Sequence, residues 1–328
     1  MFPKIPNIPK WGFVSGRISA LEAHFLPREY FMGIITQERI DDIVPHLQET
    51  FLGDYLTPGT VWEDFSALAD RCFHDMVISI RNDCPSTIPA DIFLLQSDYL
   101  NLKNAFSGAT TLAFPMGILD HEKLSAIAHG DFADLPGSVT EAGGFGEGDI
   151  YEVFPGIIDI FLDGAYLRHL LSLAQALRSE MIGTYVNDKV LASIVIILWR
   201  AVKQGIQTKR YEQYLLPLGD FTPVITELTG MQNPEAWQTA IGGEIGDLFA
   251  ESIELEMDDQ ISGFELRATN HLTGIARDGK FQTAGPERVF SFLSGLLVEM
   301  QNLKLVVTGR LNRIDQSLLK QRLKDCYV

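Results

Sequence analysis

Residues 98–108 run Asp-Tyr-Leu-Asn-Leu-Lys-Asn-Ala-Phe-Ser-Gly, and residues 299–309 run Glu-Met-Gln-Asn-Leu-Lys-Leu-Val-Val-Thr-Gly. Both stretches carry an acid, an Asn, a Leu, a Lys, a hydroxyl residue and a Gly at the same spacing. Such self-similarity predicts an internal structural repeat. The positions that define the repeat motif are Asp98, Asn101, Lys103, Gly108, Glu299, Asn302, Lys304 and Gly309. We expect these residues to serve structure rather than ligand binding.

The spacing of the motif is that of a helix. An acid and an Asn three positions apart lie on one helical face, where they can bond to each other or to a neighbouring helix end. The closing Gly is expected to be a left-handed C-cap. A third, weaker copy begins at Asp188, with Leu191 in place of the Asn, and its helix ends near Gly205.

Apolar residues recur at helical spacing along most of the chain, and alternating runs of strand length are few. Helix starts are expected at several caps or first-turn prolines, namely Thr60 with Glu63, Asp120, Asn233, Pro286 and Asp315. A very apolar helix is expected over residues 188–202. The predicted fold class is therefore all-α.

Charge and cysteine content narrow the function classes. The chain has 26 basic and 43 acidic residues, a net charge of −17, which disfavours binding to a phosphate backbone. No Lys or Arg occurs between Arg210 and Arg267, so an acidic face is expected there, either as a solvated surface or as a docking site for a basic partner. Three scattered cysteines argue against a disulfide framework. The apolar run Val190–Trp199 is shorter than the roughly 20 residues that cross a bilayer, so a soluble protein is expected.

Further short motifs accompany the repeat. They are Trp-Gly-Phe-Val-Ser-Gly-Arg at 11–17, Thr-Phe-Leu-Gly-Asp-Tyr at 50–55, Asp-Ile-Phe-Leu-Asp-Gly-Ala-Tyr at 159–166, Leu-Leu-Pro-Leu-Gly at 215–219 and Cys-Tyr-Val at 326–328. Together with the repeat, they make the chain resemble the C-type stalk protein of A/V-type rotary ATPases, related to the d-type protein of the vacuolar enzyme. The resemblance covers nearly the whole chain.

The resemblance implies a mechanical role. It implies three similar helical units with pseudo-threefold symmetry, arranged as a funnel-shaped socket: residues 1–135 with an N-terminal arm, 150–232 and 233–328. A Gly-rich linker, residues 136–149, is expected between the first two units. It also implies a non-catalytic, cytoplasmic, peripheral subunit that couples the D and F subunits of the central shaft to the membrane proteolipid ring. Neither cofactor, metal, catalytic residue nor nucleic-acid partner is expected, and the membrane is contacted only through the ring.

Enzymatic interpretations rest on weaker patterns. His74-Asp75 is the dipeptide of HD-type metal phosphohydrolases, which is the alternative function. Gly143–Gly148 lacks the Gly-Lys-Ser/Thr ending of a nucleotide loop. Asp159 and Asp163 lie four apart, as in diphosphate–Mg²⁺ sites, but only two acids are present. An unrelated helical scaffold is the third possibility.

Overall fold

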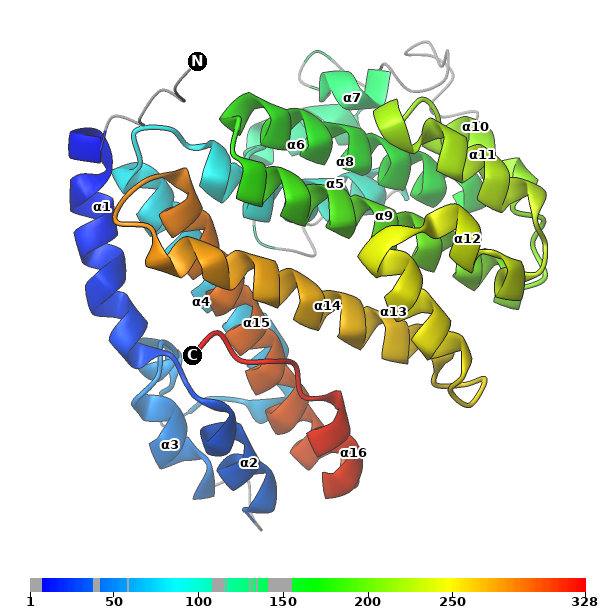
Figure 1. Ribbon diagram of the computed structural model, residues 1–328. Coiled ribbons are helices and arrows are strands. Elements are labelled where there is room, and N and C mark those ends of the chain that lie inside the picture. The colour runs from blue at the N-terminus through cyan, green and yellow to red at the C-terminus, as the bar shows by residue number, and fades with distance from the viewer. Residues whose placement is uncertain are drawn as a thin grey trace. The chain divides into compact units, whose positions relative to one another are not determined.

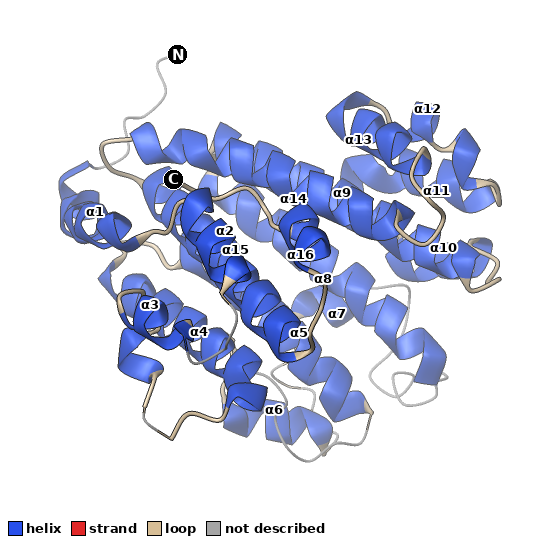
Figure 2. Cartoon of the chain, turned by 90° about the horizontal axis from the view of Figure 1, so that it is seen from below, coloured by secondary structure: helices blue, strands red, loops and turns tan. Residues whose placement is uncertain are grey.

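The fold is helical throughout the described part of the chain (Figures 1 and 2). The computed structural model describes residues 8–37, 42–57, 59–107, 115, 117–129, 131, 133, 135–140 and 155–328. Within these residues there is no β-strand. The predicted all-α class is confirmed.

The chain divides into two compact units. The terminal unit contains residues 1–93 and 269–328, and the central unit contains residues 94–268. Both boundaries fall inside long helices, α5 (Ile88–Phe106) and α14 (Gln260–Asp278). The division into three helical units stays a prediction.

The terminal unit is built around α15 (Pro286–Leu311). Seventeen of its twenty-six residues are buried, because helices pack on several of its sides. A helix that is apolar around most of its circumference belongs in a core. The other helices wholly within this unit are α1 (Ile8–Leu21), α2 (Arg28–Thr36), α3 (Val44–Gln48), α4 (Phe65–Asp83) and α16 (Gln316–Arg322).

In the central unit, α8 (Pro155–Leu177) packs against α9 (Glu180–Lys203). Both helices are rich in buried aliphatic residues, and shorter helices pack against them. The shorter helices of this unit are α6 (His121–Ala128), α7 (Gly137–Thr140), α10 (Lys209–Leu215), α11 (Thr222–Gly230), α12 (Gln238–Ile241) and α13 (Gly243–Ile253).

An aromatic cluster joins α9 to α13 and α14. Trp199 lies with its ring centroid 4.8 Å from that of Phe249 and 6.1 Å from that of Phe264. Trp237 stacks on Phe249 at 6.1 Å and donates its indole N–H to the Met231 carbonyl at 3.0 Å. Burial of each such ring stabilises the unit by roughly 1.5–3 kcal/mol, so this cluster fixes how the acidic helix α13 is held.

Three predicted helix caps are confirmed. Asp120 accepts a hydrogen bond from the Lys123 N–H at 2.9 Å at the start of α6. Asn233 caps the 3₁₀ turn Pro234–Ala236, and Asp315 accepts from the Ser317 N–H at 2.8 Å at the start of α16. Pro286 begins α15, as predicted.

Other local predictions are wrong. The Thr60 hydroxyl oxygen accepts from the Thr57 N–H at 2.8 Å and caps no helix, because a 3₁₀ turn, Trp62–Asp64, precedes α4. Helix α9 begins at Glu180 rather than near 188, since Ser179 accepts from the Ile182 N–H and supplies the cap. Of the predicted linker, residues 137–140 form α7, and residues 141–149 lie outside the described residues.

Candidate functional site

The first copy of the repeat motif lies on α5, in the central unit. Asp98 is 2% exposed, and its two carboxylate oxygens accept from the N–H groups of Ile118 and Leu119 at 2.8 and 3.0 Å. Asn101 donates its amide N–H to the Pro115 carbonyl at 3.3 Å. The acid and the Asn therefore hold the segment that leads from α5 to α6.

Lys103 of the same copy forms an ion pair across to α8. Its ammonium lies 2.7 Å from the carboxylate of Asp163 and 3.9 Å from that of Asp159. Burial raises the pKa of Asp163, and the neighbouring Lys103 charge opposes that rise. The two acids that resembled half of a Mg²⁺ site therefore share a lysine.

The second copy lies on α15, in the terminal unit. Glu299 accepts from the Leu26 N–H at 2.8 Å. Asn302 makes two bonds to the main chain of Lys324, donating to its carbonyl at 3.0 Å and accepting from its N–H at 2.9 Å. Lys304 pairs with Asp70 of α4 at 2.6 Å. Each copy thus directs its acid and Asn to main-chain groups of other segments and its Lys to an Asp on another helix.

The glycines of the motif differ from expectation. Gly309 is not a left-handed C-cap, because it lies inside α15, where a Cβ would approach the Leu319 side chain to 2.4 Å. Arg313 takes the left-handed position instead, with φ 56°, and the Ile314 N–H bonds back to the Gly309 carbonyl at 2.8 Å. In the weaker third copy, Gly205 has φ 72° and does occupy that position after α9. Gly108 lies outside the described residues.

The two acids of the motif have different surroundings. Glu299 is 4% exposed, and its Oε1 has no hydrogen-bond partner in the described residues. Burial raises its pKa to about 8, while the bond from Leu26 acts in the opposite direction. Asp98, by contrast, has donors on both oxygens.

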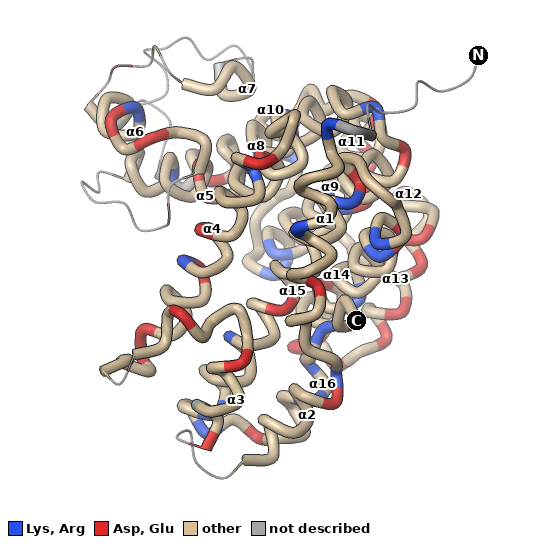
Figure 3. The backbone as a smooth tube through the Cα atoms, turned by 90° about the vertical axis from the view of Figure 1, so that its left-hand side faces the viewer, with Lys and Arg blue, Asp and Glu red and all other residues tan. Residues whose placement is uncertain are grey.

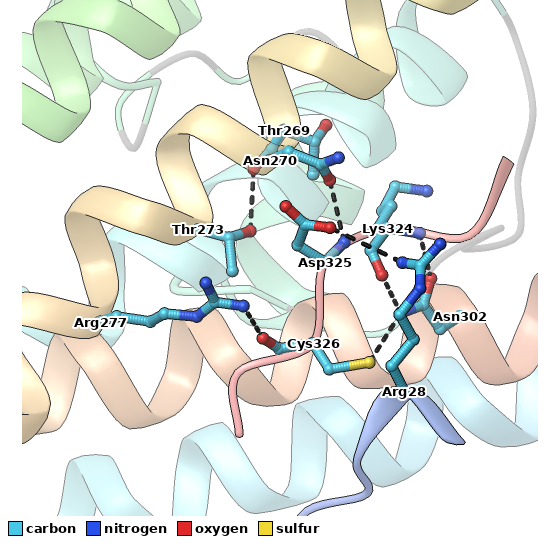
Figure 4. A network of polar contacts seen from close by, with 9 residues as sticks. All are labelled: Arg28, Thr269, Asn270, Thr273, Arg277, Asn302, Lys324, Asp325 and Cys326. Atoms are coloured by element: carbon cyan, nitrogen blue, oxygen red, sulfur yellow. Dashed lines mark hydrogen bonds and ion pairs between the residues drawn. The ribbon is translucent and has the colours of Figure 1, made fainter. Parts of the chain in front are cut away.

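The C-terminal segment is held from two sides (Figure 4). On one side, Asn270 of α14 accepts from the Asp325 N–H at 2.9 Å, and Arg277 donates to the Cys326 carbonyl. On the other side, Asn302 of α15 binds Lys324. The motif on α15 therefore takes part in fixing the end of the chain.

Tyr327 completes that attachment. Its hydroxyl donates to Glu22 at 2.8 Å and lies 2.7 Å from the Ser291 hydroxyl, while its ring covers Gly295 so closely that a Cβ there would lie 2.5 Å away. Glu22 also forms a nearly buried ion pair with Arg288. Sequence reasoning missed this cluster, because positions 22, 288 and 327 share no local spacing.

The dipeptide His74-Asp75 is placed on α4. The His74 Nδ1 lies 3.3 Å from Asp75, whose other oxygen accepts from the Tyr55 hydroxyl at 2.9 Å. Among the described residues, no three His, Cys, Asp or Glu side chains are grouped so as to hold a metal. The Gly143–Gly148 stretch lies outside the described residues.

The expected acidic face is present on α13 and the turn that follows it (Figure 3). Glu244, Asp247, Glu251 and Glu254 are all exposed and follow one helical stripe, and Glu251 pairs with Arg267 of α14 at 3.3 Å. Acidic residues therefore dominate this surface of the central unit.

Two helices, α9 and α15, are long and apolar enough to cross a membrane, judged by length and composition. The apolar window of α15 is 78% buried and that of α9 is 44% buried. Core helices of soluble proteins pass the same test, so the finding is weak evidence for a span. The run Val190–Trp199 lies within a longer apolar window, and its shortness alone does not exclude one.

These observations define an all-helical protein whose repeated polar residues fasten helices and chain segments together. The model of the family described as ATP synthase (C/AC39) subunit matches residues 14–322. The chain therefore belongs to this family, the C/d-type stalk proteins of V/A-type ATPases, and the resemblance seen in the sequence is confirmed. Members of the family are non-catalytic parts of a membrane-associated ATPase complex. A comparison with curated proteins gave no significant match.

Proposed function

We propose that this protein is the socket that couples the central shaft of a V/A-type rotary ATPase to its membrane proteolipid ring during ion transport. Membership of the C/AC39 family carries the proposal. A part that transmits torque needs helices fastened firmly to one another rather than a reactive site. The motifs on α5 and α15 make such attachments, and each includes a Lys–Asp ion pair to another helix.

The three-unit arrangement belongs to the same proposal. Equivalent contacts made by the motifs on α5 and α15 support two related units. The left-handed Gly205 after α9 supports the third, whose acid–Asn signature is reduced. We propose that these units are arranged with pseudo-threefold symmetry, as in the socket that the family resemblance implies.

The proposed partners are the D and F subunits of the shaft and the proteolipid ring. The exposed acidic stripe on α13 suits a protein partner with basic residues, since complementary charge steers association, and it does not suit nucleic acid. The protein is then cytoplasmic and peripheral, and it meets the membrane only through the ring.

Affinity capture of the tagged full chain from gently solubilised membranes of its source, read by mass spectrometry, tests the proposal. We expect a small proteolipid together with shaft and nucleotide-binding subunits. Capture from the same membranes without the tag is the control. Recovery of the protein alone would overturn the assignment of partners.

Small-angle X-ray scattering tests the socket separately. A compact globule of this length has a radius of gyration of about 20 Å. A hollow funnel must exceed that value clearly, and a measurement at the compact limit would contradict the socket.

A further inference from the structure

Helix α2 is fastened to α15 at both ends. At its N-terminal end the Leu26 N–H bonds to Glu299, and at its C-terminal end Arg310 donates to the Gln37 carbonyl. Residues 26 and 37 are eleven positions apart, as are 299 and 310, so both spans cover about 16 Å of helix. The two helices therefore run parallel and in register, and these two side chains lie at the ends of their contact (Figure 2).

The Glu299 end of this attachment is electrostatically unusual. Oε2 has one main-chain donor, Oε1 is buried with none, and no described cation lies within ion-pair distance of the carboxyl group. An ion in such a place loses its hydration without compensation, whereas a neutral carboxylic acid loses much less. The packed state of α2 therefore favours the protonated form.

The titratable groups that interact electrostatically with Glu299 come from three other elements. They are Tyr30 on α2, Cys72 on α4 and Cys326 in the C-terminal segment. Burial raises the pKa of Tyr30 and of Cys72 to about 12, and that of Cys326 to about 11. All three groups are neutral up to pH 8, so none supplies a compensating positive charge.

Charged and titratable groups lie one step further out on the surrounding elements. They are Glu22 and His24 near the end of α1, Arg28 on α2, His46 and Glu49 around α3, Asp54 in the turn after α3, Asp75 on α4, Arg277 on α14 and Asp325 in the C-terminal segment. The histidines are the ones that need control variants, because histidine ordinarily titrates between pH 5 and 8.

We propose that Glu299 is a pH-sensitive latch for helix α2: its neutral carboxyl group holds the N-terminal end of α2 against α15, and loss of its proton favours the release of that end. Release exposes the carboxyl group to water, where it ionises near its ordinary value of 4.5 rather than at about 8. Opening is thereby coupled to deprotonation between these two pH values, and it becomes easier as the pH rises. The inference concerns this chain alone and does not depend on its partners.

Hydrogen exchange of the full chain from pH 5 to 8, followed by mass spectrometry, tests the latch. Exchange rates are divided by the intrinsic rates at each pH, which gives protection factors for the peptide over residues 26–37. We expect protection in the wild type to fall by up to tenfold per pH unit, and protection in Glu299→Gln to be independent of pH. Equal slopes in the two proteins, or no slope in the wild type, would overturn the proposal.

Matched variants identify the titrating group. Glu49→Gln removes a nearby exposed acid, and His24→Gln and His46→Gln remove the nearby imidazoles. Each must keep the wild-type slope, and loss of the slope in any of them assigns the effect elsewhere and sinks the latch.

Infrared spectroscopy of the wild type gives a readout that needs no folded variant. At pH 6.5 we expect the carbonyl band of a protonated carboxylic acid, and it should disappear as the pH is raised past 8. A spectrum without that band at pH 6.5 would contradict a neutral Glu299.

Discussion

The substitution Glu299→Gln is expected to stabilise the protein at neutral pH and not in acid. The carboxyl group has a pKa of about 8 in the folded chain and an ordinary value of 4.5 when exposed. Because the folded-state value is the higher one, the folded protein binds the proton more tightly, and this contribution to stability is fully present below about pH 4.5. It is lost as the pH rises through the window from 4.5 to about 8.

The size of the effect follows from the width of that window. Each pH unit corresponds to about 1.4 kcal/mol, so the wild type loses roughly 3 kcal/mol between pH 4.5 and pH 7 through this group. Gln has nearly the same shape and does not titrate. Any constant cost of placing an amide beside Leu26 is the same at every pH and cancels from the slope.

The assay is urea unfolding of both proteins at pH 5, 6, 7 and 8. We expect the free energy of unfolding of Glu299→Gln, minus that of the wild type, to rise by about 1.4 kcal/mol per pH unit. Two parallel pH profiles would refute the argument, because they would mean that Glu299 is already ionised in the folded protein at neutral pH.

Three further predictions concern the attachments of the motif. Asn302→Ala removes two bonds to Lys324 and should lower the free energy of unfolding by about 1–3 kcal/mol in urea denaturation; Asn312→Ala, at an exposed position at the end of the same helix, should change it by less than about 0.5 kcal/mol, and equal losses would contradict the assigned role. Gly295→Ala places a methyl group against the Tyr327 ring and should cost about 1–3 kcal/mol, measured as a lower melting temperature; an unchanged value would show that the ring moves freely. Lys103→Met leaves Asp163 without its cation, so stability should fall at pH 7, and the loss should shrink in acid as that carboxyl group is protonated; a pH-independent loss in urea titrations would argue against the ion pair.

Local signals in the sequence predicted the helices well where a cap acts within its own turn. Asp120 and Asp315 accept from N–H groups two or three residues ahead, so the sequence contains both partners. Thr60 failed because a competing 3₁₀ turn forms before α4 and its hydroxyl oxygen accepts from the Thr57 N–H instead. Short-range capping is decided by a few residues, and it can be lost to an equally short alternative.

The end of α15 shows a second limit. Gly309 recurs at the end of the repeat and suggested a left-handed cap, but Leu319 of α16 packs where its Cβ would be, and the helix continues to Leu311. Arg313 then adopts the left-handed conformation. The glycine is explained by close packing with α16, which only the folded chain reveals.

By itself, the sequence determined the all-α class, the repeated acid–Asn–Lys pattern and the family, because these depend on periodicity and on residue types in fixed order. Tertiary structure alone decided what the pattern contacts. Lys304 meets Asp70 and Glu299 meets Leu26 across 234 and 273 positions, and no local spacing encodes such pairs. The same packing gives Asp98 two main-chain donors and leaves one oxygen of Glu299 with none. Equivalent positions in the sequence thus acquire different proton affinities, because the free energy of an ionised carboxylate depends on the hydration and hydrogen bonds that remain after distant segments have packed around it.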